Sequence, residues 1–137
     1  MKIKKQIVAA AAVAITITAV APATASHAAA DVTWSSGSWV RARLYENANF
    51  GGAVMTVKGQ GEFCSTSTSD RDTIHSRLSI SGWNDVISSA RDYQKCDVNL
   101  FVDLDFGGAQ TGFVNYDSTG ANLSSTMNDK ASSFILS

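Results

Sequence analysis

A composite pattern occurs twice in this 137-residue chain, and it requires a fold that accommodates two similar units. Each copy has an aromatic residue, four further residues, an aromatic residue followed by Gly-Gly, and later Asn-Asp, two residues and Ser-Ser. The first copy starts at Tyr45 and ends with residues 84–89, and the second starts at Phe101 and ends with residues 128–133. Such a duplication indicates a supersecondary unit that needs a neighbour to bury its apolar face.

Short alternating stretches between clusters of Gly, Asn, Asp and Ser predict strands in both copies. In residues 40–44 apolar side chains alternate with arginines, and residues 98–102 open the second unit in a similar way. A Gly-Gly pair in each copy permits a tight turn, so residues 53–57 and 109–114 are predicted as return strands. With closing strands at Ser89 and Ser133, about eight strands in all predict an all-β sandwich.

The first unit carries an insertion. Tyr45 to Asn84 spans 39 positions, whereas Phe101 to Asn128 spans 27. The additional residues fall within 59–82, a polar segment that predicts a long loop anchored by Cys64. We expect a short helix or turn near residues 72–76 of this loop.

Residues 1–30 are typical of a secretory signal peptide. Three lysines within the first five residues precede an apolar stretch at 7–20, and small-residue cleavage sites follow at 23–25 and 28–30. The mature chain is therefore expected to begin at Ser26 or Asp31. An apolar stretch of this length without a stop-transfer flank argues against a retained membrane anchor. We expect a secreted protein with one domain at residues 31–137.

Removal of this leader leaves eight basic and twelve acidic residues, a net charge of −4. No basic cluster remains along the sequence, so neither nucleic acid nor a membrane is expected as a main partner, and divalent cations fit better.

Cys64 and Cys96 are the only cysteines. In an exported protein such a pair predicts a disulfide, with two buried free thiols as the alternative. Closing this loop would stabilise the fold by roughly 3 to 4 kcal/mol on the chain-entropy model.

The two copies resemble known motifs of the βγ-crystallin family, specifically its microbial, calcium-binding branch. Residues 45–52 and 101–108 are similar to the Greek-key hairpin signature, and residues 84–89 and 128–133 are similar to the calcium motif Asn/Asp-Asn/Asp-x-x-Ser/Thr-Ser. The resemblance implies a βγ-crystallin-like sandwich of two Greek-key motifs, with units at about 39–92 and 96–137. It also implies that the domain binds up to two Ca²⁺ ions. Calcium is a hard cation that takes six to eight oxygen ligands.

By resemblance, each ion is held by a carboxylate, a hydroxyl and two backbone carbonyls. The first set is the Asp85 carboxylate, the Val86 carbonyl, the Ser88 hydroxyl and the Glu46 carbonyl. The second set is the Asp129 carboxylate, the Lys130 carbonyl, the Ser132 hydroxyl and the Val102 carbonyl. The Lys130 ammonium, and valine in place of glutamate at position 102, predict weaker binding at the second site. Dissociation constants on the order of 10⁻⁵ to 10⁻³ M are expected.

The remaining motif residues have more than one interpretation. The family uses the last serine of each motif, here Ser89 and Ser133, to tie the folded hairpin back to the sheet. Asn84 and Asn128 would either ligate the ion or form turns with their own backbone. The paired aromatic residues of the hairpins and Trp83 are expected in the core.

No catalytic constellation is evident, and His75 is the only histidine after the leader, so we expect no enzyme activity. Similar exported actinobacterial proteins include metallopeptidase inhibitors and killer-toxin-like crystallins, which supply two alternatives to a calcium-binding module. The first is a proteinase inhibitor that would act on an extracellular peptidase through the segment 64–81, with Arg71 or Arg77 at its reactive site. The second is a killer-toxin-like or cell-wall-associated protein. The chain is expected to be a monomer.

Overall fold

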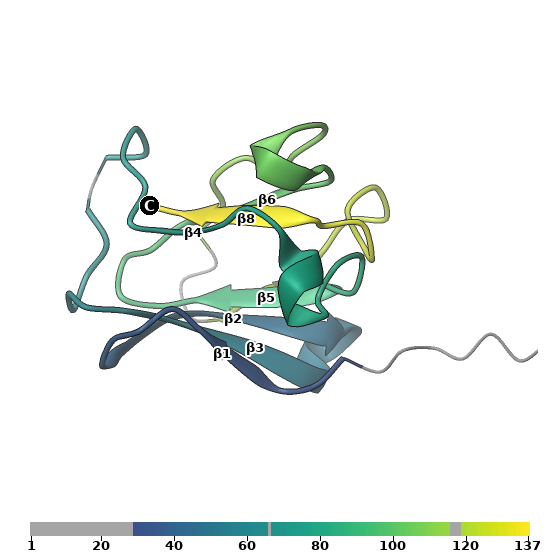
Figure 1. Ribbon diagram of the computed structural model, residues 1–137, viewed down its shortest axis with the longest axis horizontal. Coiled ribbons are helices and arrows are strands. Elements are labelled where there is room, and N and C mark those ends of the chain that lie inside the picture. Colours follow the sequence, from purple (N-terminus) through teal and green to yellow (C-terminus); the bar gives the residue numbers. More distant parts are fainter. Residues whose placement is uncertain (1–28, 66, 116–118) are drawn as a thin grey trace, which may run out of the picture.

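The computed structural model describes residues 29–65, 67–115 and 119–137, which fold into two facing β-sheets (Figure 1). The expected leader at residues 1–30 lies outside the described residues apart from Ala29 and Ala30. Within the described part of the chain, no helix is long and apolar enough to cross a membrane.

Eight strands are named in the described residues, five in one sheet and three in the other. The larger sheet has the order β1 (Val32–Trp34), β3 (Gly51–Gly59), β2 (Trp39–Asn47), β5 (Ser89–Asp92) and β7 (Ala121–Asn122). The smaller sheet has the order β4 (Thr73–His75), β8 (Ser133–Leu136) and β6 (Val98–Phe101). Three short 3₁₀ helices complete the fold: η1 (Ala48–Phe50), η2 (Leu78–Ser81) and η3 (Leu104–Phe106).

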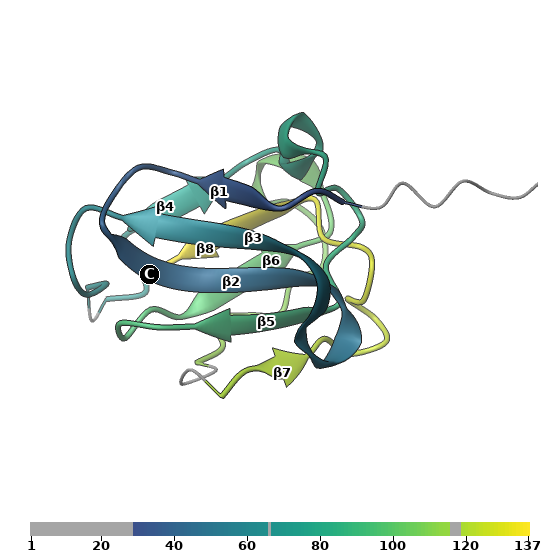
Figure 2. The ribbon, with the colours of Figure 1, turned by 90° about the horizontal axis from the view of Figure 1, so that it is seen from below.

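The two sequence units exchange strands between the sheets (Figure 2). β4 belongs to the first unit but pairs antiparallel with β8, and β7 belongs to the second unit but pairs antiparallel with β5. Each unit thereby completes the sheet of the other, which is the Greek-key arrangement expected from the duplication. The predicted all-β sandwich of two Greek-key motifs is confirmed.

Individual strands differ from the sequence prediction in three places. The return strand of the first unit is β3, but its counterpart at 109–114 makes only isolated bridges, Phe101 with Gln110 and Val98 with Val114. β1 was not predicted, and it lies parallel to β3 at the edge of the larger sheet. The helix or turn expected near 72–76 is wrong, because this segment is β4, whose pairing with β8 outweighs its weak local pattern.

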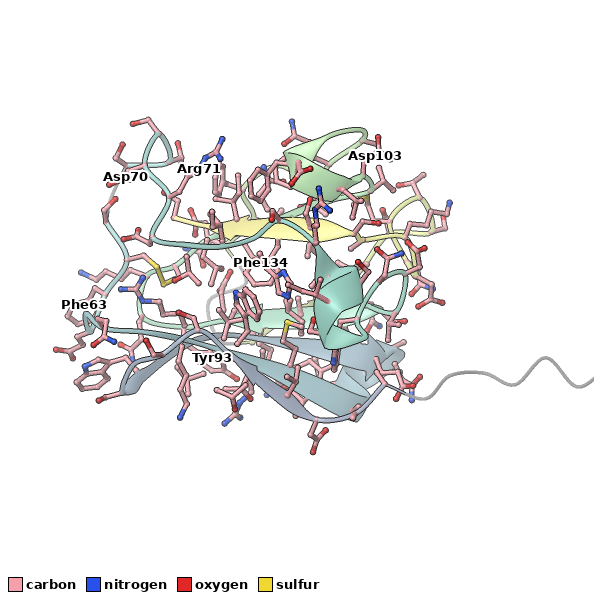
Figure 3. All side chains as sticks on the ribbon, viewed as in Figure 1. Phe63, Asp70, Arg71, Tyr93, Asp103 and Phe134 are labelled. Carbon is pink, nitrogen blue, oxygen red and sulfur yellow. A yellow bond between two sulfur atoms is a disulfide. The ribbon has the colours of Figure 1, made fainter. Side chains whose placement is uncertain are left out.

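The core lies between the two sheets and draws on both units. Leu44 and Met55 of the larger sheet, Leu100 of the smaller sheet and Trp83 between them are fully buried. Figure 3 shows Phe134 of β8 pointing into the space between the sheets, where it is also fully buried. Burial of these large apolar side chains is the main stabilising term for both units.

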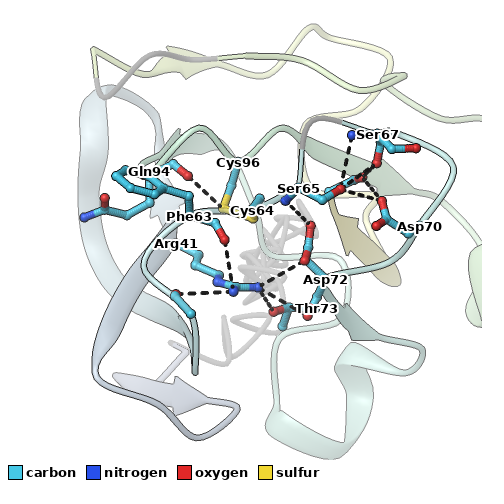
Figure 4. Close-up of a disulfide and its surroundings, with 12 residues drawn as sticks. Arg41, Phe63, Cys64, Ser65, Ser67, Asp70, Asp72, Thr73, Gln94 and Cys96 are labelled. Atoms are coloured by element: carbon cyan, nitrogen blue, oxygen red, sulfur yellow. Dashed lines mark hydrogen bonds and ion pairs between the residues drawn. A yellow bond between two sulfur atoms is a disulfide. The ribbon is translucent and has the colours of Figure 1, made fainter.

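The insertion of the first unit is held by a buried arginine beside the disulfide (Figure 4). Cys64 and Cys96 are bonded as predicted, at a sequence separation of 32 residues. Arg41 does not continue the outward alternation of its neighbours, because a bulge between Val40 and Ala42 breaks the register of β2 with β3. Its side chain is buried and donates to four acceptors of the insertion. These are the carbonyls of Gly61, Phe63 and Asp72 and the hydroxyl of Thr73.

Candidate functional site

Each aromatic-Gly-Gly hairpin closes through a left-handed turn of its backbone. Asn49 and Phe50 have φ values of 57° and 62°, and Asp105 and Phe106 have nearly the same values of 54° and 64°. Phenylalanine rarely adopts this conformation, so the surrounding structure must stabilise it. Part of that support is an edge-to-face contact between the paired rings, with centroids 5.5 Å apart for Tyr45 and Phe50.

The last serine of each motif supplies the rest of the support, as predicted. The Ser89 hydroxyl accepts a hydrogen bond from Phe50 N at 3.0 Å and donates one to the Asn47 carbonyl at 2.7 Å. Ser133 makes the equivalent pair of bonds in the second hairpin, at 3.0 and 2.7 Å. Both serines are fully buried, so neither is free to ligate an ion.

The two Asn-Asp-x-x-Ser-Ser segments bind one another through their backbones. Asp85 N donates to the Ala131 carbonyl at 3.0 Å, and Asp129 N donates to the Ile87 carbonyl at 3.0 Å. Both aspartates have left-handed backbones, with φ values of 56° and 54°. The reciprocal bonds place the acidic residue of each motif against the other motif.

Asn84 and Asn128 orient the carboxylates that follow them. The Asn84 amide donates to Asp85 Oδ2 at 2.7 Å, and the Asn128 amide donates to Asp129 Oδ2 at 2.8 Å. Both asparagines also lie in turns, which is one of the two roles expected from the sequence, and the contact with the carboxylate adds a positioning role. It holds each carboxylate in a defined direction before any ion binds.

An open cavity of about 210 Å³ lies where the first hairpin meets the two motifs. Its lining combines three acidic residues with hydroxyl, amide and backbone groups. The lining residues are Glu46, Asn47, Asp85, Val86, Ser88 and Asp129. The four residues of the first predicted set are therefore brought together, with Asp129 of the second set beside them. The Ser88 hydroxyl donates to Asp129 Oδ1 at 2.8 Å, a contact between the motifs that sequence reasoning missed.

Solved structures of βγ-crystallin domains have the same architecture. One, from a study of the evolution of the eye-lens βγ-crystallin fold, is 25% identical, has a TM-score of 0.54, and covers 75% of this chain and 91% of that chain. A βγ-crystallin domain from Flavobacterium johnsoniae is 28% identical with a TM-score of 0.50, covering 70% and 92% respectively. The chain has the βγ-crystallin fold and is similar to microbial βγ-crystallin domains. A Clostridium beijerinckii βγ-crystallin domain, 17% identical with a TM-score of 0.50, has the same fold and covers 70% and 95%. No protein-family model and no curated protein matches the sequence.

The second predicted set surrounds the equivalent hairpin. Ser132 N donates to the Phe101 carbonyl at 2.8 Å, just as Ser88 N donates to the Tyr45 carbonyl at 2.9 Å. Val102 is half-buried, Ser132 is buried and Lys130 is exposed, and none of the three lines the first cavity. The two halves therefore share one backbone plan but differ in charge.

The residues before β1 contact the first site, which the sequence did not indicate. The Glu46 carboxylate accepts hydrogen bonds from Ala53 N at 3.0 Å and from Ala29 N at 3.1 Å. The indole N–H of the buried Trp83 donates to the Ala30 carbonyl at 3.0 Å. Residues at the end of the expected leader thus support the Glu46 side of the cavity.

The donor groups of the first cavity suit a hard cation. They are carboxylates, a hydroxyl and carbonyls, and sulfur and imidazole are not among them. Among residues 29–65, 67–115 and 119–137, no three His, Cys, Asp or Glu side chains gather closely enough to form a ready-made metal cluster. An ion bound here would therefore depend on carbonyl, hydroxyl and water oxygens in addition to carboxylates, which calcium accepts.

Proposed function

We propose that this protein is a secreted, non-enzymatic calcium-binding βγ-crystallin module stabilised by up to two Ca²⁺ ions. The observation that supports the proposal is the oxygen-lined cavity in which Ser88 of one motif meets Asp129 of the other at 2.8 Å. A divalent cation there would neutralise carboxylates that otherwise repel one another across the cavity. It would also join a hairpin and both motifs, so binding and folding would be coupled.

The contact between motifs refines the proposed ligand sets. In the first site, the Asp129 carboxylate would act with the Ser88 hydroxyl and the carbonyls of Val86 and Glu46. By the symmetry of the two units, the Asp85 carboxylate would act with Ser132 and the carbonyls of Lys130 and Val102. Each ion would then bind groups from both units rather than from one.

A calcium titration of the chelator-treated mature protein tests the proposal. We expect two equivalents by calorimetry and a higher unfolding midpoint with the ion, because a ligand that binds only the folded state stabilises it by about 2.7 kcal/mol per site at a hundredfold excess over Kd. Ser88→Arg and Ser132→Arg should each remove one equivalent, since an arginine places a cation where a hydroxyl ligand is expected. Ser79→Arg, at an exposed position of η2, is the matched control and should retain both. Two equivalents in either site variant would refute the ligand assignment.

The pairing of Asp129 with Ser88 has its own test. If these residues serve one ion, Ser88→Arg, Asp129→Ala and the double variant should all retain one equivalent. If each motif holds its own ion, the double variant should lose both. The binding stoichiometry of the double variant therefore distinguishes crossed ligand sets from separate ones.

A proteinase inhibitor on the same fold is the second candidate, because the exposed part of the insertion is braced at its base. The Ser65 backbone N–H donates to Asp72 Oδ2 at 2.9 Å and its hydroxyl donates to Asp70 Oδ1 at 2.6 Å, next to the disulfide-bonded Cys64 (Figure 4). A loop fixed in this way would lose little entropy on entering a protease cleft. Titration of secreted metallo- and serine peptidases should give stoichiometric loss of activity, and unchanged activity would exclude the peptidases tested.

The two arginines considered for the reactive site have partners on the domain. The Arg71 guanidinium lies 4.9 Å from the centre of the Phe106 ring, and Arg77 pairs with Asp105 at 3.5 Å. Either side chain would have to leave its partner to enter a protease pocket. Arg71→Ala should therefore weaken inhibition only if Arg71 is the reactive residue, and Arg77→Ala only if Arg77 is. Each variant serves as the control for the other.

A further inference from the structure

The outer face of the larger sheet gathers basic side chains that are far apart in the sequence. Lys58 of β3, Arg43 of β2 and Arg91 of β5 alternate with inward residues of their strands, so all three lie on the outer side. We call these three residues the basic face. Val40, Tyr45, Val54 and Thr56, which are among the other residues of these strands, are uncharged. These cations therefore form a local basic surface on a mature chain that has more acidic than basic residues.

The acidic residues of the same strands do not neutralise the basic face. Asp92 points inward and is 1% exposed, and the Glu46 carboxylate binds the backbone N–H groups of Ala29 and Ala53 at the end of β2. The ion pairs within 4.0 Å among the described residues involve Arg41 and Arg77 instead. Burial, reinforced by the neighbouring Tyr93, raises the pKa of the Tyr45 phenol above its usual value, so this group also carries no negative charge.

Two of the three cations stand directly opposite each other. Arg43 and Arg91 are register partners in the antiparallel pairing of β2 with β5. Like charges in such a pair destabilise a sheet, because their side chains are close neighbours on one face. The ion pairs within 4.0 Å among the described residues include neither arginine. An oxyanion bound between the two guanidinium groups would relieve their repulsion.

Aromatic rings hold both guanidinium groups in place. The Arg91 guanidinium lies 3.9 Å from the centre of the Phe50 ring, and the Arg43 guanidinium lies 5.8 Å from the centre of the Tyr93 ring. Such stacking reduces the entropy that each side chain loses when it binds a ligand. The basic face is therefore largely preorganised.

We infer that the basic face binds a linear anionic polymer outside the cell through oxyanion groups repeated along its length. Arginine matches carboxylate, sulfate and phosphate groups alike, so the shared chemistry is the oxyanion. The three cations lie on three adjacent strands that are about 4.8 Å apart, so a single anion could contact at most two of them. A ligand that contacts all three must therefore carry several anionic groups, as a polymer does. The inference does not depend on calcium binding.

Binding to three defined polymers at low and high salt tests the inference. Heparin offers sulfate, polygalacturonate offers carboxylate and polyphosphate offers phosphate. Monomeric galacturonate is the control that tests whether a polymer is required. The titrations use the mature protein without added calcium, because these polymers bind calcium themselves. We expect at least one polymer to bind, more weakly as salt rises, and the monomer to bind at least tenfold more weakly.

Charge-matched variants locate the site. Arg43→Gln and Arg91→Gln should each weaken binding at least fivefold and reduce its salt dependence, and Arg43→Lys should retain part of the affinity because it keeps the charge. Arg77→Gln changes the net charge equally on another surface and should stay within twofold of the unchanged protein. Thermal melts identify any variant that is unfolded, and Arg43→Gln, at an exposed position, is expected to fold. The inference is overturned if no polymer binds, or if Arg77→Gln weakens binding as much as Arg43→Gln.

Discussion

Adjacent serines in each motif have different tasks because consecutive side chains of an extended chain point in opposite directions. The Ser88 hydroxyl reaches Asp129 in the cavity, whereas the Ser89 hydroxyl bridges Asn47 and Phe50 in the hairpin. Two adjacent residues of the motif thus serve as a candidate calcium ligand and as a structural tie of the hairpin. A one-residue shift would exchange the two roles.

Loss of the structural tie should destabilise the domain even without calcium. Ser89→Ala and Ser133→Ala each remove a buried hydroxyl that makes two hydrogen bonds, and they leave backbone groups of a strained hairpin unsatisfied. We expect each variant to lower the free energy of unfolding by about 1–3 kcal/mol. Urea denaturation in the presence of chelator measures this loss. Ser79→Ala, on the exposed side of η2, is the control, and equal stability of all three variants would contradict the assigned role.

His75 should make the stability sensitive to mild acid. Its ring is 1% exposed and stacks on Trp34 with centroids 3.5 Å apart, and burial lowers the pKa of His75 from 6.5 to about 4. Above pH 6.5 the ring is neutral in both states and the pH has no effect through this group. Between pH 6.5 and about 4 only the unfolded chain takes up the proton, so the free energy of unfolding should fall by up to about 3 kcal/mol.

Comparison with His75→Gln isolates this contribution from that of all other titratable groups, because both proteins share them. The difference in unfolding free energy between the two proteins should shrink as the pH falls from 7 to 4.5. A constant difference over this range would show that His75 is not responsible.

At the scale of elements, the sequence predicts best what is repeated and worst what depends on long-range pairing. The hairpins, closing strands and disulfide follow from local patterns or from composition. β4 and β1 do not, because three-residue strands have little periodicity and are defined by β8 and β3 respectively. The candidate site shows the same division. Its residues follow from the two motifs, but the contact of Ser88 with Asp129 depends on how the units dock.

The segment before β1 provides an element-scale prediction about the two expected start sites. A chain that starts at Asp31 lacks the Ala30 carbonyl that accepts the Trp83 indole N–H, and it lacks the Ala29 N–H on Glu46. Because Trp83 is fully buried, its donor would be left unsatisfied. We expect the Asp31 chain to be less stable than the Ser26 chain by about 1–3 kcal/mol in chemical denaturation.

A Trp83→Phe substitution in both chains provides the control for this truncation. Phenylalanine has no N–H group that needs an acceptor. In the Trp83→Phe background, removal of residues 26–30 should therefore lower the free energy of unfolding clearly less. Equal losses with tryptophan and with phenylalanine would assign the effect to other contacts of the segment.

At the scale of the whole molecule, the two units are joined in three ways. β4 and β7 each complete the sheet of the other unit, the disulfide connects Cys64 of the first unit to Cys96 at the start of the second, and the motifs exchange backbone hydrogen bonds. A duplicated sequence does not therefore imply two independent folding units. The core between the sheets exists only when both halves are present.

Separate halves should consequently fail to fold. A fragment of residues 29–95 keeps β1, β2, β3 and β5 but loses β8, the only partner of β4 within the described structure, together with the smaller-sheet side of the core. The fragment 96–137 would have to expose the apolar faces of β6 and β8. We expect both fragments to show the narrow amide dispersion of unfolded chains by NMR, and their mixture under oxidising conditions to regain dispersed signals. The first fragment should also bind no calcium at millimolar concentration, although it contains Glu46, Val86 and Ser88, because Asp129 is on the other piece. A folded, calcium-binding first fragment would show instead that one unit is sufficient for both the fold and the site.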